Sequence, residues 1–242
     1  MPQEVLTVKQ VARYLHIRPE EVEKLASGGK IPCYKVRGEH RFRKGDVDHY
    51  VELSMGDLNQ QRLAEIEHGV ATHHGIEPTE SQVMALIPTG GVLAPLASRT
   101  RDAAIRQLVA AADAAELVYD KNDLVEKIRQ RETLCPTTVA PGVAMPHPRY
   151  PQPYDIAASF LIVGRADSGI PFGSTDGSLT RLFFLICCKD DRTHLHVLAR
   201  LGQMLTAEAI VELMEAPDAA AIRAVLERRE QAIITGIEKR QQ

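Results

Sequence analysis

His147 is the residue whose surroundings most clearly suggest chemistry. It lies between Pro146 and Pro148 in the stretch APGVAMPHPR, after a short apolar run. Proline fixes its own φ and restricts the preceding residue to extended backbone, so the two prolines set the position of the imidazole. An imidazole in water has a pKa of about 6.5, so a large neutral fraction carries a nitrogen lone pair at cytoplasmic pH. Because no Ser or Cys nucleophile lies in the same segment, the simplest chemistry is attack of this nitrogen on a phosphoryl group.

The elements that must position His147 follow from the pattern between Val83 and the C-terminus. TRDAAIRQLVAAADAA, with Thr100 as its cap, and DKNDLVEKIRQRETL have apolar residues at helical spacing. IAASFLIVGR and LTRLFFLICCK are apolar runs of strand length, and HLHVLARLGQML and PDAAAIRAVLERR return to the helical period. Helices that alternate with buried strands predict an α/β sandwich. Cys187 and Cys188 are expected on opposite faces of a strand as reduced thiols.

Three stretches of this region carry a family resemblance: RETLCPTTVAPGVAMPHPR, GIPFGSTDGSLTRLFFLI and HLHVLARLGQML. In their order and spacing they resemble the IIA domain of the bacterial phosphoenolpyruvate-dependent phosphotransferase system, in its fructose/mannitol and nitrogen-regulatory branch. The resemblance implies the α/β sandwich of that type over residues 83–242. It also implies that the protein is a phosphocarrier with a phosphohistidine intermediate and not a turnover enzyme.

The resemblance assigns roles to particular residues. His147 matches the phosphorylated histidine, Arg131 the arginine near the phosphoryl group, and His194 the second histidine near that site. Arg131 would offer a forked donor to phosphate oxygens and His194 a single N–H. His196, two residues further on, matches less closely. The family usually has IPHG where this chain has MPHP, so Pro148 removes a backbone N–H that a phosphate could have used.

Each of these residues also has a simpler interpretation. His147 could have a structural role, Arg131 could form a surface ion pair with Glu132, and His194 could simply stand at the start of a helix. These alternatives remain open at the level of the sequence.

Residues 1–53 form a second unit with its own start and stop signals. Thr7 and Gln10 have the spacing of a capping box for a helix over 8–15, and Pro19 suits the first position of a second helix that ends at Gly28-Gly29. IPCYKVRGEHRFR predicts two short strands around a Gly38-Glu39 turn, and GDVDHYVEL predicts a third helix. This order predicts a helix-turn-helix with a wing.

The stretches LTVKQVARYLHI, GGKIPCYKV and HRFRKGDVDHYV resemble the winged helix-turn-helix of the excisionase group of MerR-like proteins. The resemblance implies that the second helix enters the major groove of DNA and that Arg41 and Arg43 of the wing meet phosphates. Further candidate contacts are Arg18, Lys24, Lys35 and Arg37. The second helix departs from the pattern because Glu20, Glu21 and Glu23 would repel phosphates. A winged module turned to protein contacts is the alternative.

Residues 54–82 have a polar composition and predict a linker with some helix, in which Leu58, Leu63 and Ile66 are spaced too loosely for a heptad seam. His68, His73 and His74 lie here without a nearby cysteine, so a solvated linker is favoured over a metal site. No cofactor is expected, because the GG and SG pairs lack the strand-turn-helix context of a phosphate loop.

The net charge and the composition of the whole chain limit the possible functions. The net charge is -3 and the sequence pI about 6.3, so only a local basic surface could bind nucleic acid. No apolar targeting or membrane-spanning stretch is evident, so we expect a cytoplasmic protein without membrane contact. DNA readers of this size often pair across two half-sites, and we expect a homodimer on that general ground alone.

The combination predicts a regulator of the nitrogen-regulatory IIA type. A histidine-containing phosphocarrier protein, or its nitrogen-branch counterpart, would phosphorylate His147, and the modification would alter DNA binding. The alternative is a relay component for sugar uptake that passes the phosphoryl group to a separate IIB protein, with the N-terminal unit used for protein contacts. A third class is a DNA-binding protein whose IIA unit senses by binding alone. A hydrolase has least support, because no Ser-His-Asp order or metal-ligand cluster can be assembled.

Overall fold

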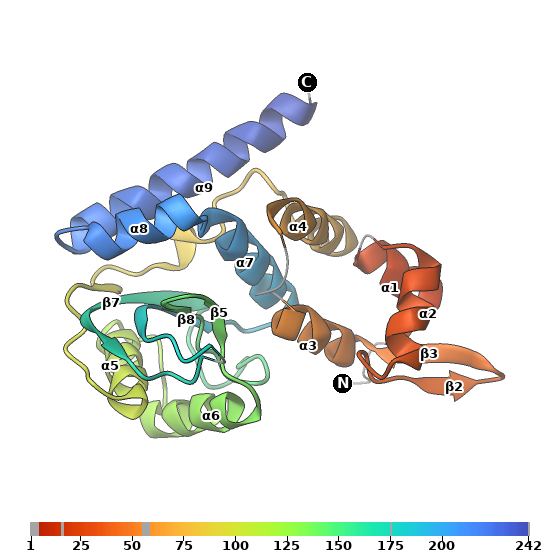
Figure 1. Cartoon of the computed structure of the whole chain (residues 1–242), viewed down its shortest axis with the longest axis horizontal. Coiled ribbons are helices and arrows are strands. Elements are labelled where there is room, and N and C mark those ends of the chain that lie inside the picture. Colours follow the sequence, from red (N-terminus) through yellow and green to blue (C-terminus); the bar gives the residue numbers. More distant parts are fainter. Residues whose placement is uncertain (1–4, 16, 55–58, 175, 242) are drawn as a thin grey trace.

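The structure is a computed structural model of the whole chain, and it describes residues 5–15, 17–54, 59–174 and 176–241. His16, in the predicted first turn, and Leu58, in the predicted linker, lie outside the described residues. Two units are evident in Figure 1, a large sheet covered by helices and a smaller N-terminal unit that ends in a hairpin.

The large sheet has five strands in the order β4-β7-β8-β6-β5. Its centre is an antiparallel pair of long strands, and β4 and β6 flank this pair in parallel. The strands are β4 (Val92–Leu93), β5 (Thr138–Ala140), β6 (Val143–Ala144), β7 (Phe160–Ile170) and β8 (Thr180–Cys187). The short inner strand β6 leads directly into the segment that carries Met145 and His147.

Both faces of the sheet are buried because apolar residues occupy successive positions of β7 and β8. Phe160 and Ile162 pack with α5 (Arg101–Ala114) and α6 (Lys121–Leu134), whereas Leu161 and Val163 pack on the other side. That other face is covered by α7 (Asp191–Met204), α8 (Ala207–Glu215) and α9 (Ala219–Gln241), as Figure 1 shows. The predicted α/β sandwich is confirmed. Cys187 and Cys188 are buried free thiols in opposite packing clusters, as expected for neighbours on a strand.

The start of α5 agrees with the sequence, since the Thr100 hydroxyl accepts the N–H of Ala103. Helix α8 was not predicted, and α9 continues well beyond the expected segment. A short 3₁₀ turn, η2 (Met84–Leu86), precedes β4.

The N-terminal unit contains β1 (Val5–Thr7), α1 (Val8–Tyr14), α2 (Pro19–Ser27), β2 (Tyr34–Val36), β3 (Glu39–Arg43) and α3 (Lys44–Ser54). The predicted capping box between Thr7 and Gln10 is confirmed. Two details differ from the prediction. Strand β1 adds a third strand beside β3, and the hairpin turn is Arg37-Gly38, one residue earlier than predicted. Both turn residues have positive φ, 52° and 85°, which suits a two-residue hairpin loop.

The helix expected within the predicted linker 54–82 is present as α4 (Gln60–His74), but it is packed and not solvated. This helix buries Leu63, Ile66 and Val70, whose spacings of three and four place them on one helical face. It packs along α7, where a Cβ at Gly202 would lie 3.0 Å from Leu63 Cδ1. The core of the N-terminal unit is therefore continuous with the helical layer of the sandwich.

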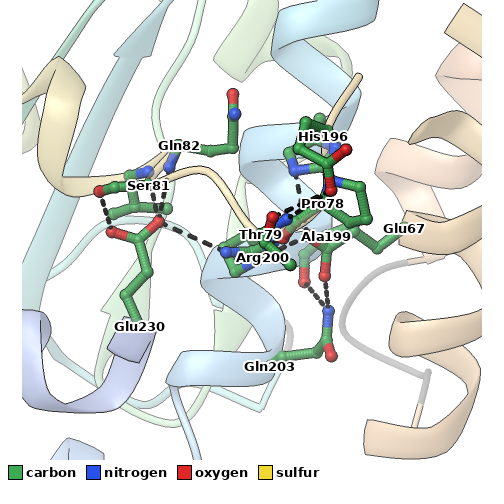
Figure 2. A network of polar contacts seen from close by, with 12 residues as sticks. Glu67, Pro78, Thr79, Ser81, Gln82, His196, Ala199, Arg200, Gln203 and Glu230 are labelled. Atoms are coloured by element: carbon green, nitrogen blue, oxygen red, sulfur yellow. Dashed lines mark hydrogen bonds and ion pairs between the residues drawn. The ribbon is translucent and has the colours of Figure 1, made fainter. Parts of the chain in front are cut away.

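Polar side chains join α4, α7 and α9 in an arrangement that we call the interhelical network. It consists of buried Glu67, His196, Arg200 and Glu230 and partly buried Gln203 (Figure 2). Arg200 Nε donates to Glu67 Oε1 at 2.5 Å, Gln203 also donates to Glu67, and His196 Nε2 lies 3.0 Å from the same Glu67 oxygen. Arg200 Nη1 lies 3.6 Å from Glu230 Oε1.

Residues 78–84, which follow α4, form hydrogen bonds with this network. Arg200 Nη2 donates to the carbonyl of Pro78 at 2.7 Å. The carboxylate of Glu230 accepts the N–H groups of Gln82, Val83 and Met84 and the hydroxyl of Ser81. These contacts fix the chain where it passes from α4 to the sandwich.

Candidate functional site

His147 is buried in the segment that follows β6, with 3% of its surface exposed. Its Nδ1 lies 2.8 Å from the carbonyl oxygen of Met145. A carbonyl oxygen only accepts hydrogen bonds, so Nδ1 carries the hydrogen and donates it. In the neutral ring the lone pair then belongs to Nε2. The local backbone thus selects the nitrogen that can act as a nucleophile.

His194 lies against this imidazole. The two ring centroids are 4.9 Å apart and the ring planes are inclined by 59°. His194 comes from the first turn of α7, which Asp190 caps by accepting the N–H of Thr193. The structure thus brings together two histidines that are 47 positions apart in the sequence (194 minus 147).

Arg131 is buried at the last turn of α6, with 2% of its surface exposed. Its Nη1 donates to the carbonyl of Cys135 at 2.8 Å. Its Nε is also buried and has no hydrogen-bond acceptor among the described residues. A buried donor without an acceptor is costly, so a bound anion would stabilise this arrangement.

The proposed surface ion pair between Arg131 and Glu132 is not formed. Glu132 is buried, and its carboxyl group accepts the backbone N–H of Thr137 at 3.2 Å and also the Thr137 hydroxyl. Burial raises the pKa of Glu132, although the hydrogen bonds from Thr137 and the charge of Arg131 act in the opposite direction.

A cavity of about 380 Å³ opens beside Arg131. Its wall includes two further cations, Lys127 and Arg149, and the exposed Tyr150. Arg149 and Tyr150 directly follow the His147-Pro148 pair, so the cavity joins the arginine to the segment that carries the buried imidazole. Arg131 and Arg149 favour an anionic occupant, whereas Asp123 and Asp155 already compensate the charge of Lys127. Lys127 and Arg149 were not predicted; the only sequence signal was that Arg149 follows the PHP run.

His196 is directed elsewhere. It contacts Glu67 in the interhelical network, because residues two apart on a helix point in nearly opposite directions. Of the two histidines in THLH, the structure therefore places only His194 against His147.

The six predicted DNA contacts are spread over the N-terminal unit. Arg18, Lys24, Lys35, Arg37 and Arg43 are exposed. Arg41 is half-buried, and its guanidinium donates to Glu39 Oε2 at 2.9 Å and to the carbonyl of His40 at 3.0 Å. Arg41 is thus already engaged within the wing.

The strand register separates these cations further. Lys35 pairs with His40, and directly paired residues share a face, so Lys35 lies on the face that carries His40 toward α2. Arg41 and Arg43 lie on the opposite face, because successive residues of a strand alternate. Of the four predicted contacts in the hairpin, Lys35 is the one that the strand register places on the side of α2.

Two of the three acidic residues of α2 have structural partners. Glu21 accepts the N–H of Arg18 at 3.0 Å, and this backbone hydrogen bond lowers the pKa of its carboxyl group. Glu23 Oε2 lies 2.6 Å from His40 Nδ1 of β3. These contacts explain why carboxylates occupy a helix that was predicted to face phosphates: one caps the helix and the other holds the wing.

Within the described part of the chain, no group of three or more His, Cys, Asp or Glu residues is arranged to hold a metal ion. Among the same residues, no helix is both long enough and apolar enough to cross a lipid bilayer.

Comparison with known families matches both units. Residues 86–229 match the family "Phosphoenolpyruvate-dependent sugar phosphotransferase system, EIIA 2", and residues 5–52 match a helix-turn-helix domain family. The nitrogen regulatory protein of Bradyrhizobium diazoefficiens is 34% identical over 145 residues, which cover 58% of this chain and 92% of that protein. The fructose-specific EIIABC component of Bacillus subtilis is 31% identical over 128 residues. That match covers 52% of this chain and 20% of the relative.

Solved structures share the fold of the sandwich. The nitrogen regulatory protein IIA-Ntr of Neisseria meningitidis has a TM-score of 0.55 at 20% identity, covering 60% of this chain and 99% of that chain. The mannitol IIA of Escherichia coli has a TM-score of 0.51 at 19% identity, covering 57% and 96%. The E. coli mannitol IIA has also been solved in complex with phosphorylated enzyme IIB. That match has a TM-score of 0.51 at 19% identity and covers 57% of this chain and 94% of that chain.

Proposed function

The chain belongs to the EIIA 2 family of the phosphoenolpyruvate-dependent sugar phosphotransferase system, and from this membership we propose that His147 accepts a phosphoryl group from a histidine phosphocarrier protein or its nitrogen-branch counterpart. The observation that carries the proposal is the hydrogen bond from His147 Nδ1 to the Met145 carbonyl, which leaves the lone pair on Nε2. His194 and Arg131 supply donors around the acceptor.

The transfer needs one bond formed and one broken. His147 Nε2 attacks the phosphorus of the donor's phosphohistidine, the new N–P bond forms, and the donor's N–P bond breaks. The electron pair of that bond returns to the donor imidazole, which leaves as a neutral ring because its other nitrogen carries a hydrogen. His147 keeps its hydrogen on Nδ1, so the positive ring charge passes from the donor to His147. Arg131 stabilises the charge that spreads over the phosphoryl oxygens, because its buried Nε has no acceptor among the described residues. Pro148 cannot contribute a backbone N–H, so side chains carry this task.

Labelled phosphotransfer tests the proposal. The full chain is incubated with the donor carrying a radioactive phosphoryl group, and incorporation into wild type, His147→Ala and His68→Ala is compared. His68 is exposed on α4 and serves as the matched histidine control. We expect label in wild type and in His68→Ala and none in His147→Ala. Equal labelling of all three would refute the assignment.

We further propose that phosphorylation of His147 alters DNA binding by the N-terminal unit. Helix α7 supports the connection, because His194 stands at its start and Arg200 lies further along it against Glu67 of α4. Helix α4 in turn packs on α1, where Arg62 Nη2 donates to the carbonyl of Leu15 at 2.6 Å. The two units, proposed as residues 1–53 and 83–242, are thus joined by packed helices.

Operator selection followed by affinity measurement tests this coupling. The unmodified and the phosphorylated full chain are titrated against a selected duplex, with His147→Ala as the control that stays unmodified. A difference in affinity between the two forms of wild type supports the coupling. Equal affinity for the same duplex would rule it out. Sedimentation of the same samples tests the predicted homodimer.

The relay function remains the second candidate. The solved complex of the E. coli mannitol IIA with phosphorylated enzyme IIB supports this candidate. In that case this chain would pass the phosphoryl group to a separate IIB protein, and the N-terminal unit would serve protein contacts. Loss of label from the phosphorylated chain on addition of candidate IIB proteins would favour the relay. A chain that binds its donor and DNA without ever taking up label would instead favour sensing by binding alone.

A further inference from the structure

Glu132 is a buried carboxyl group that the proposed mechanism does not use. It lies beside Arg131 on the last turn of α6 and has 3% of its surface exposed. Both oxygens are directed to one residue, since Oε2 accepts the N–H of Thr137 and Oε1 accepts its hydroxyl. An apolar side chain could fill the same space without the cost of burying a carboxyl group. The contact between Glu132 and Thr137 therefore indicates a role beyond filling space.

The residue that Glu132 holds is connected to the nucleophile. The carbonyl of Thr137 accepts the N–H of Met145 at 2.9 Å. The carbonyl of Met145 then accepts the Nδ1 hydrogen of His147 at 2.8 Å. Three successive contacts thus run from the Glu132 carboxyl group to the imidazole. The last contact is the one that decides which ring nitrogen carries the lone pair.

Arg131 binds the same short segment of the chain, just before Thr137. Its Nη1 donates to the carbonyl of Cys135, two residues before Thr137. Adjacent residues of α6 therefore fix one short segment, 135–137, from which the support of His147 begins. A shift of this segment would move both the guanidinium beside the phosphoryl group and the carbonyl that orients the imidazole.

We propose that Glu132 is a positioning residue for phosphoryl transfer, which acts through Thr137 and the Met145 carbonyl to keep the hydrogen of His147 on Nδ1 and the lone pair on Nε2. The inference rests on the proposed role of His147 as phosphoryl acceptor. It assigns Glu132 no contact with the phosphoryl group itself.

The test uses the full chain with four substitutions. Glu132→Gln keeps the shape but places an NH2 group where one of the two accepting oxygens was, so it faces a Thr137 donor with a second donor. Thr137→Val removes only the hydroxyl. Thr137→Ser restores the hydroxyl, and Glu126→Gln is the matched control, an exposed glutamate on the same helix. Two quantities are measured: the rate of His147 labelling by the phosphorylated donor, and the tautomer of the neutral His147 ring from its ¹⁵N shifts across pH.

We expect Glu132→Gln to be labelled roughly 10- to 100-fold more slowly, by analogy with the loss when an outer partner of a metal-binding histidine is removed. The same variant should gain the tautomer with hydrogen on Nε2. Thr137→Val should change both quantities in the same direction, and Thr137→Ser and Glu126→Gln should behave like wild type. A purely structural role would lower stability without moving the tautomer.

The outcomes separate this inference from the proposed function. If wild type takes no label, the acceptor role of His147 fails, and the ¹⁵N measurement still decides whether Glu132 sets the tautomer. If wild type is labelled and a folded Glu132→Gln shows wild-type tautomer and rate, the inference is overturned. Should Glu132→Gln fail to fold, the Thr137→Val and Thr137→Ser pair decides, and an unchanged tautomer in Thr137→Val then overturns it.

Discussion

Arg131 has two separate hydrogen-bond donor groups that act in different directions, which a lysine could not provide. One nitrogen holds the carbonyl of Cys135, and the buried Nε, which has no acceptor among the described residues, is left for an anion. A guanidinium can do both because its donors form a rigid planar fork, whereas an ammonium is a single point charge. The same positive charge is therefore not sufficient at this position.

We predict that Arg131→Lys lowers the rate of His147 labelling by roughly 100-fold, the usual cost of losing one oriented donor to a transferring group. Single-turnover transfer from the labelled phosphocarrier measures the rate. Arg129→Lys is the control on the same helix, where the guanidinium contacts Asp102 and Glu126. Wild-type rates in Arg131→Lys would show that charge alone suffices.

Pro148 offers a test in the opposite direction. Proline has no N–H, so Pro148→Ala returns a backbone donor next to the acceptor without adding a polar side chain. We expect labelling to become up to about 10-fold faster, because a hydrogen bond to a charged group contributes roughly 1.5 kcal/mol or more. Pro146→Ala tests the backbone restraint on its own. Slower labelling in Pro148→Ala would mean that rigidity at this position outweighs the added donor.

The sequence could predict the residues that we propose for contact with the phosphoryl group, but not those that support them. His147 was evident from its two prolines, and Arg131 and His194 came from the order of three motifs. Glu132 looked like a surface partner for its neighbour, because its contact with Thr137 depends on how α6 meets β5. Lys127 and Arg149 share a cavity only after the segment that follows His147 has folded against α6.

At the level of elements, α4 shows how a polar composition can hide a packed helix. The segment was predicted as a linker with some helix, because its composition is polar and Leu63 and Ile66 are spaced too loosely for a heptad seam. In the structure Glu67 is 3% exposed and is compensated by Arg200 and Gln203 of α7. A carboxylate and its partners lie far apart in the sequence, so no local pattern predicts such a pair. The strands and most helices were predictable because their periodicity is local.

We predict that Glu67→Gln lowers the free energy of unfolding by about 3 kcal/mol, because it leaves the buried Arg200 guanidinium without its closest carboxylate. Urea denaturation of the full chain measures the change. Glu65→Gln on the same helix removes a partner of the half-exposed Arg62 and should cost less than about 1 kcal/mol. Equal effects of the two substitutions would show that burial of the pair does not matter.

The same residue predicts a pH dependence. Burial opposes ionisation of Glu67, but the contact with His196 and the charge of Arg200 outweigh it, so its pKa is lowered. A carboxyl group with a lower pKa in the folded state stabilises the fold above its unfolded pKa of about 4.3. This stability is lost as the pH falls through the folded-state pKa.

Wild type should therefore lose more stability than Glu67→Gln as the pH falls below the unfolded pKa of about 4.3, and the two should converge once the Glu67 carboxyl group is protonated in the folded state. Urea titrations at several pH values measure the difference. A constant gap between the two proteins over this range would mean that Glu67 does not titrate as proposed.

For the whole molecule, the important property is that the two units share one packed core. Helices α3 and α4 both contact α7, so the N-terminal unit has a fixed place beside the sandwich (Figure 1). The wing hairpin lies at the end of the molecule away from the large sheet. Such packing gives a modification at His147 a physical route to the N-terminal unit, provided that α7 or α4 has two arrangements of similar energy.

The interhelical network predicts which variant should uncouple the two proposed activities, phosphorylation of His147 and DNA binding by the N-terminal unit. Glu67 touches neither His147 nor the exposed cations of the N-terminal unit, so Glu67→Gln should still be labelled at His147 and should still bind DNA in its unmodified form. It should, however, reduce the difference in DNA affinity between the unmodified and phosphorylated forms, because α4 no longer holds the position set by Arg200.

The affinities are measured below the temperature at which Glu67→Gln unfolds and at one fixed salt concentration. These conditions keep differences in stability and in screening of the DNA phosphates out of the comparison. Glu65→Gln should retain the full difference. If Glu67→Gln also retains it, the signal does not pass through the contact between α7 and α4.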